Sequence, residues 1–244
     1  MKIQLSLLTL LIITIMFYGC KKDEPESTPN LYNGKSTAVF NNNLTYGSLT
    51  DQDGNIYKTI IIGTQTWMAE NLRTTKYTNG ESITLMTDNV IWAQLSTGAY
   101  CNFENTLKDT TIATYGRLYN WYAVNDNREI APEGWHVPTY YDWLILIDFL
   151  GNDTLSGGKM KEAGLIHWLN PNKGADNSSG FTALPGSFRG PEVFYSLGET
   201  SSFWSSSQYD SSWAYGCVNA CDNTFAFCGI SEKICGYSVR CIKD

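Results

Sequence analysis

Cysteine offers this chain its widest choice of chemistry, because a thiol can carry a lipid, form a disulfide, bind a metal or act as a nucleophile. The 244 residues contain seven cysteines. Cys20 stands alone near the start of the chain, and the other six are Cys101, Cys217, Cys221, Cys228, Cys235 and Cys241. The isolated position of Cys20 indicates a role of its own.

The residues before Cys20 have the layout of a secretory signal. Lys2 supplies a positive charge, a stretch rich in leucine and isoleucine follows, and Gly19 is a small residue directly before the cysteine. This arrangement resembles the bacterial lipobox, which predicts that residues 1–19 are a lipoprotein signal peptide and that Cys20 is lipidated. A transmembrane helix would need about 20 mostly apolar residues, and polar residues interrupt this stretch. An uncleaved signal anchor or a plain secreted protein is the alternative.

The segment after Cys20 has the composition of a tether. Residues 21–30 read KKDEPESTPN and hold almost no apolar group that could enter a core. We therefore predict that residues 20–50 comprise the lipidated cysteine and a flexible tether. A lysine followed by two acids resembles the surface-export signal of lipoproteins in the Bacteroidetes group, and a generic solvated linker is the alternative. The expected location is the outer membrane, with a lipid anchor and the domain facing outwards from the cell.

The six remaining cysteines form an even set, which predicts disulfides in an exported chain. A turn at Asp222-Asn223 would set Cys217 opposite Cys228, and we predict that these two bond. Cys235 and Cys241 would lie roughly 20 Å apart in a continuous strand, too far for a bond. No C-x2-C spacing occurs and only two histidines are present, so we predict no metal and no cofactor.

Aromatic side chains lie near serines and one aspartate in FWSSSQYDSSWAY, residues 203–215. Such side chains stack on sugars or clasp a protein partner. The candidate ligand contacts are therefore Trp204, Tyr209, Asp210 and Trp213, for an unidentified glycan or protein. The alternative is that this stretch is mostly core strand and turn.

Catalytic motifs are not evident. The sequence shows no Ser-His-Asp order, glycine-rich phosphate loop or paired-carboxylate motif. His136 is interpreted as a packed side chain rather than a base. The late cysteines have no histidine nearby to activate a thiol. We predict structural disulfides and no enzyme.

Two elements that would position these residues have clear local signals. An Asp-Gly turn precedes a β-branched strand, Ile56 to Ile62, and a second strand runs through Trp67. Asp51, Asp53 and Asn55 are spaced like the start of a calcium loop, but the further ligands are missing and a turn is favoured.

The clearest helix is expected after Pro138. Thr139 is placed to cap it, with Asp142 completing a capping box. Trp143, Ile147 and Leu150 share one face, and Gly151 follows as the stop signal. We expect Trp143 to be buried.

Other elements are shorter. Leu118, Trp121 and Tyr122 have helical spacing, which predicts a short helix within residues 115–126. A short helix followed by a loop is expected within residues 156–179, and then a strand at 180–189. The tail from residue 203 predicts three strands.

Charge restricts the partners. The net charge is −7, and loss of residues 1–19 with their single lysine gives −7 − 1 = −8. An acidic chain without a basic cluster is not expected to bind nucleic acid or anionic lipid.

Seven separated motifs carry a resemblance to a known family: DQDGNIYKTIIIGTQTWMAENL, YGRLYNWYAV, GWHVPTYYDW, GGKMKEAG, GFTALPGSFRG, FWSSSQYDSSWAY and GYSVRCIKD. Residues 51–244 resemble the Fibrobacter succinogenes major paralogous domain, which is similar to the formylglycine-generating-enzyme and C-type-lectin fold group. The resemblance implies an α+β domain with a twisted antiparallel sheet, a few short helices and long loops. It implies no activity. Where the family commonly has a cysteine, this chain has Ala131, which implies that Cys241 lacks its usual partner.

These observations predict a lipid-anchored, surface-exposed binding or adhesion module without catalysis. A structural component of a cell-surface assembly is the alternative. A further alternative is a cysteine-dependent enzyme of the formylglycine-generating type.

Overall fold

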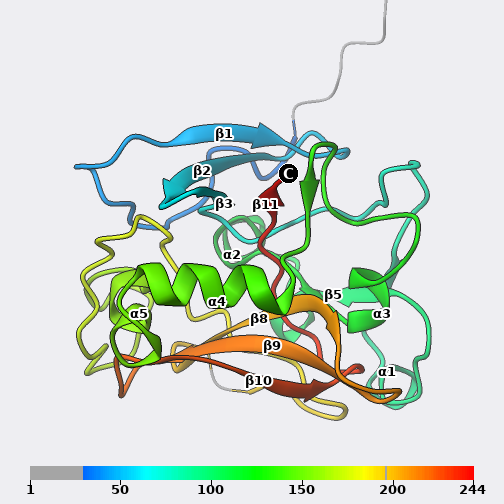
Figure 1. Ribbon diagram of the computed structural model, residues 1–244. Coiled ribbons are helices and arrows are strands. Elements are labelled where there is room, and N and C mark those ends of the chain that lie inside the picture. The colour runs from blue at the N-terminus through cyan, green and yellow to red at the C-terminus, as the bar shows by residue number, and fades with distance from the viewer. Residues whose placement is uncertain (1–29, 196) are drawn as a thin grey trace, which may run out of the picture.

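Two antiparallel sheets, with a ten-residue helix between them, form the frame of the fold (Figure 1). The computed structural model describes residues 30–195 and 197–244. The predicted signal peptide, Cys20 and residues 21–29 lie outside the described residues. The fold is a mixed α+β fold with long loops and few, short helices.

The first sheet has the strand order β1-β2-β3-β11-β7. Its strands are β1 (Gly47–Thr50), β2 (Ile56–Ile62), β3 (Gln65–Met68), β11 (Ile242–Lys243) and β7 (Trp135–His136). The predicted strand Ile56–Ile62 and its partner through Trp67 are confirmed. All neighbouring pairs are antiparallel, and β11 is inserted between β3 and β7 at Ile242, which faces Trp67 on one side and His136 on the other.

The turn before β2 is built on one buried carboxylate. The side chain of Asp51 accepts hydrogen bonds from the backbone N–H groups of Asp53 and Asn55 and from the hydroxyl of Tyr57. Gly54 takes a positive φ of 76°, which glycine adopts without steric cost. The turn interpretation of these residues is confirmed.

The second sheet has the order β10-β9-β8, formed by β8 (Thr200–Gln208), β9 (Trp213–Ala220) and β10 (Ala226–Glu232). The three predicted strands are confirmed. The register pairs Cys228 with Cys217. Residues 235–241 do not form the continuous strand that was expected, since their strand-like pairing is limited to isolated bridges, such as Tyr237 with Tyr119.

A third, small sheet comprises β4 (Thr84–Leu85), β5 (Ala99–Cys101) and β6 (Leu118–Tyr119). The helix predicted within 115–126 is wrong in its first half, because Leu118 pairs with Cys101 in this sheet. From Leu118 onwards only α3 (Trp121–Val124) is helical in this stretch, capped by the side chain of Asn120. Pairing with a distant strand has overridden the local helical spacing. The strand predicted at 180–189 is also wrong, since that segment makes only isolated bridges.

The remaining helices are α1 (Asn89–Trp92), α2 (Asp109–Tyr115), α4 (Tyr140–Phe149), α5 (Asp153–Met160) and a 3-10 turn at Phe103–Asn105. The capping box at the start of α4 is confirmed: the Thr139 hydroxyl accepts from the Asp142 N–H, and the Asp142 carboxylate accepts from the Thr139 N–H. Gly151 follows the end of α4 with a φ of 100°.

An aromatic cluster of the core lies between the two main sheets. Trp143 of α4 is fully buried, with its ring against Trp67 of β3, Phe203 of β8 and Phe181. Ile147 and Leu150 are buried in the same cluster, which confirms the predicted inner face of α4. Burial of this face fixes the helix against both sheets at once.

Residues 30–50 are not a free tether. The Val39 N–H donates to the carboxylate of Glu162 (2.6 Å), the Thr37 N–H donates to the Thr114 hydroxyl (3.0 Å), and β1 pairs along its length with β2. The expectation of a flexible tether is therefore wrong for this part. The backbone polar groups of the segment find partners on the domain, and the folded unit includes residues 30–50 as well as 51–244.

Buried cations hold the long loops. Irregular segments leave backbone carbonyls unpaired, and a buried unpaired carbonyl is costly. Arg240 donates to the carbonyl groups of Met68, Phe181 and Thr182. The ammonium group of Lys161 likewise donates to three carbonyls from separate positions in the chain.

Candidate functional site

A cleft of about 960 Å³ opens beside the junction of β7 and β11. One wall is the loop between α3 and β7 (residues 125–134), and another is the turn between β1 and β2. Thr139, Ser206 and Asp244 close the other sides. With Thr78, five segments far apart in the sequence contribute to one concave surface.

Trp135 and His136 reach the cleft because β7 is an edge strand of the first sheet. Both side chains are partly exposed. His136 was interpreted as a packed side chain, but 42% of its side chain is exposed. Its Nδ1 lies 2.7 Å from a carboxylate oxygen of Asp244. Packing leaves this histidine on the surface because only one side of the short strand is covered.

The loop wall is held in place by Arg128. Its guanidinium group bonds to both carboxylate oxygens of Asp126 and to Glu81, and it lies over the Tyr77 ring at 4.0 Å. Gln52 joins the opposite wall by donating to the Ile130 carbonyl. These contacts arrange the cleft walls before any ligand binds.

Carboxylates dominate the charge of the cleft. They belong to Asp51, Asp126, Glu129, Glu133 and Asp244, and no lysine or arginine is among the described lining residues. Hydrogen bonds from Arg128 hold the pKa of Asp126 below its usual range, so this group stays ionised at neutral pH. Amides and hydroxyls of Asn125, Asn127 and Thr78 lie alongside. The lining thus combines the Trp135 ring and several apolar side chains with many hydrogen-bonding groups.

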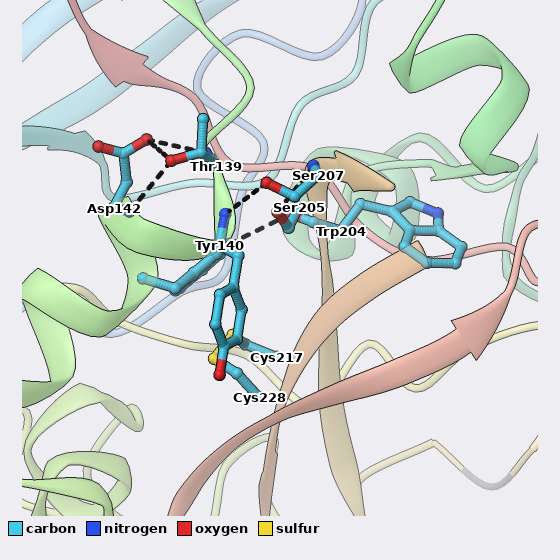
Figure 2. Close-up of a disulfide and its surroundings, with 9 residues drawn as sticks. Thr139, Tyr140, Asp142, Trp204, Ser205, Ser207, Cys217 and Cys228 are labelled. Atoms are coloured by element: carbon cyan, nitrogen blue, oxygen red, sulfur yellow. Dashed lines mark hydrogen bonds between the residues drawn. A yellow bond between two sulfur atoms is a disulfide. The ribbon is translucent and has the colours of Figure 1, made fainter. Parts of the chain in front are cut away.

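The first predicted ligand contact is wrong. Trp204 is fully buried, its indole N–H donates to the Tyr119 carbonyl, and its ring stacks on Tyr237. Figure 2 shows Trp204 pointing away from Tyr140. Trp204 therefore belongs to a core strand, which was the alternative interpretation of this stretch.

Sequence comparison provides one positive result. A sequence model of the Fibrobacter succinogenes major domain matches residues 60–243. The chain belongs to this family. No match was found among curated proteins or among solved structures. In this member of the Fibrobacter succinogenes major domain family, β1 and the start of β2 precede the matched residues.

The other predicted contacts of this family member lie in the hairpin between β8 and β9. The N–H groups of Tyr209 and Asp210 both donate to the Trp213 carbonyl, which brings the three residues together. The Asp210 carboxylate accepts from the N–H groups of Ser212 and Trp213 and so shapes the turn. Tyr209 is exposed and Trp213 is partly exposed.

Two of the six cysteines in the described part of this family member are bonded to each other. The other four, Cys101, Cys221, Cys235 and Cys241, are free, so the expectation of disulfides is wrong for them. Cys217 and Cys228 form a disulfide between β9 and β10, as predicted (Figure 2). Cys235 and Cys241 are buried and do not bond to each other. Burial raises the pKa of Cys235 to about 12, so its thiol is protonated at neutral pH. Ala131 and Cys241 lie in one core cluster.

No local pattern in the sequence indicates the cleft, although Trp135 and His136 of its lining belong to the motif GWHVPTYYDW. Glu129, Glu133 and Asp244 are ordinary surface residues until the sheet assembles. Within residues 30–195 and 197–244, no group of three or more histidine, cysteine or acidic side chains could hold a metal ion. No helix in the same part of the chain is long and apolar enough to cross a membrane.

Proposed function

We propose that this protein is a lipid-anchored binding module on the bacterial surface and that its cleft binds a neutral saccharide, without catalysis. The observation that carries the proposal is the cleft, which combines the exposed part of Trp135 with a dense set of hydrogen-bonding groups. Sugar rings present apolar C–H faces, which pack on aromatic rings, and hydroxyls, which bond to carboxylates and amides.

The charge of the lining supports a neutral ligand. The carboxylates of Glu129 and Glu133 make no ion pair within the described part of the chain. Uronate or sulfate groups would place like charges in the cleft and lose affinity by repulsion. We also propose the finer fold relationship, to C-type-lectin-like and formylglycine-generating-enzyme-like domains, on the basis of the motif resemblance. The state of two late cysteines supports the non-catalytic proposal, because Cys217 is bonded to Cys228 and burial raises the pKa of Cys235 to about 12.

A glycan array tests the binding function. The chain from residue 30 onwards is expected to bind neutral glycans, and Trp135→Ala is expected to weaken that binding at least about tenfold, because the stacking platform is lost. Phe225→Ala, which removes an exposed ring outside the cleft, is the matched control and should bind like the parent protein. Silence on all glycans would favour the alternative, a structural component of a surface assembly.

The anchor is proposed from the sequence before and after Cys20. Replacing Cys20 by serine removes the thiol that the lipid would modify. The variant is expected to leave the membrane fraction and appear in the soluble fraction after cell lysis. Ser27→Ala in the following segment serves as a control that should stay membrane-bound. Unchanged partitioning of Cys20→Ser would contradict the lipoprotein interpretation.

A further inference from the structure

A group of four tyrosines adjoins the cleft. Tyr140 of α4 stacks on Tyr215 of β9, with 4.3 Å between ring centroids and 29° between planes. Tyr209 meets Tyr215 edge-on at 5.7 Å, and Tyr141 meets Tyr140 at 6.0 Å. We call these four residues the tyrosine cluster. Tyr141 and Tyr209 are 73% and 55% exposed, so the cluster presents aromatic surface to solvent.

The cluster is continuous with the cleft along two chain segments. Thr139 and Ser206 line the cleft, and the residues that follow them bond to each other: the Tyr140 N–H donates to the Ser207 hydroxyl at 3.0 Å. Figure 2 shows Ser207 beside the start of α4, with the Tyr140 ring extending from that point towards the disulfide. The cluster therefore begins one residue beyond the cleft wall.

Each ring of the cluster contacts another ring, stacked for Tyr140 and Tyr215 and edge-on for the other two pairs. Such contacts restrict the side-chain rotamers, so less side-chain entropy would be lost on binding. The charged groups nearby already have hydrogen-bond partners. The Lys233 ammonium group donates to the carbonyls of Asp210 and Ser211, and the Asp210 carboxylate accepts a hydrogen bond within its own turn. Within the described residues none of the four phenol hydroxyls bonds to the protein. These groups remain available to a ligand that has both apolar faces and hydroxyls.

We propose that the tyrosine cluster is a second part of the binding site, which holds further units of the same neutral saccharide chain that occupies the cleft. This inference rests on the proposed function. It makes the ligand an oligosaccharide or polysaccharide recognised along its length rather than a single sugar at a chain end. Tyr209 and Tyr141 would stack on the additional units, because their rings are the most exposed of the four.

The test is the dependence of affinity on chain length. Calorimetry would compare a neutral oligosaccharide series, from the disaccharide upwards, chosen from the best binder on the glycan array. Affinity of the parent protein is expected to rise with length and then level off. Tyr209→Ala is expected to weaken the long oligosaccharides about three- to tenfold and to leave the disaccharide unchanged. Tyr209→Phe keeps the ring and is expected to retain the length dependence.

Ile145→Ala, which removes an exposed side chain of α4 outside the cluster, is the matched control. Long and short chains that bind equally well to the parent protein would overturn this inference and leave the cleft as the whole site. Unchanged affinity of Tyr209→Ala for long chains would overturn it in the same way. Failure of every oligosaccharide to bind the parent protein would instead overturn the proposed function itself.

Discussion

Replacing Trp143 by alanine is expected to lower the free energy of unfolding by about 3 to 5 kcal/mol. The side chain is fully buried, and its ring packs between Trp67 of the first sheet and Phe203 of the second. Its removal leaves a cavity where α4 meets both sheets, and close-packed neighbours collapse only in part into such a space. Chemical denaturation followed by fluorescence or circular dichroism measures the loss.

Ile145→Ala is the control for this substitution. Ile145 lies on the same helix but is 51% exposed, so its replacement should change stability by less than about 0.5 kcal/mol. A loss below about 1 kcal/mol in Trp143→Ala would contradict the assignment of the inner helix face.

Replacing Lys161 by methionine is expected to cost about 3 to 5 kcal/mol. Lys161 is fully buried, and its ammonium group donates to the carbonyls of Lys173, Ala220 and Asn223 at 2.7 to 3.0 Å. Methionine keeps much of the apolar stem but leaves three buried acceptors without a donor. The loss should appear in the denaturation midpoint, and hydrogen exchange should show opening around residues 173 and 220–223.

Lys159→Met is the matched control, since it removes the same charge two residues away, in the last turn of α5, and its side chain is partly exposed. A loss below about 0.5 kcal/mol is expected. Equal losses in the two variants would show that charge, rather than the buried hydrogen bonds, accounts for the effect.

Lys161 also predicts a pH dependence. Burial lowers the pKa of Lys161 to about 8, whereas a lysine in an unfolded chain titrates near about 10.4. Between these pH values the unfolded state binds more protons than the folded state, so this group makes the free energy of unfolding rise with pH. Below about pH 8 it contributes no slope. The Lys161→Met variant should lack this rise. Urea denaturation of the parent protein and the variant from pH 7 to pH 10 measures the difference in free energy of unfolding, in which the contributions of other groups cancel.

Local signals in the sequence were sufficient to predict those elements whose stabilising residues are close neighbours in the chain. Thr139 and Asp142 cap α4 across three positions, and the side-chain pattern from Trp143 to Leu150 assigns its buried face. The Asp51 turn and β2 follow from residues within one short stretch. The register of the β9–β10 hairpin, and with it the Cys217–Cys228 disulfide, followed from a turn and the spacing on either side.

The sequence alone thus determined the family, the main hairpins, α4 with its buried tryptophan and one disulfide. Tertiary structure decided the remaining pairings and the cleft, because these depend on interactions between residues far apart in the chain. Leu118 has helical spacing in the sequence but pairs with Cys101 in a sheet. The irregular register of β8 between Trp204 and Gln208 breaks the simple alternation that would show which aromatic rings face the core. Pairing of β11 with β7 brings Trp135 and Asp244 to the same cleft, and no local pattern selects such distant partners.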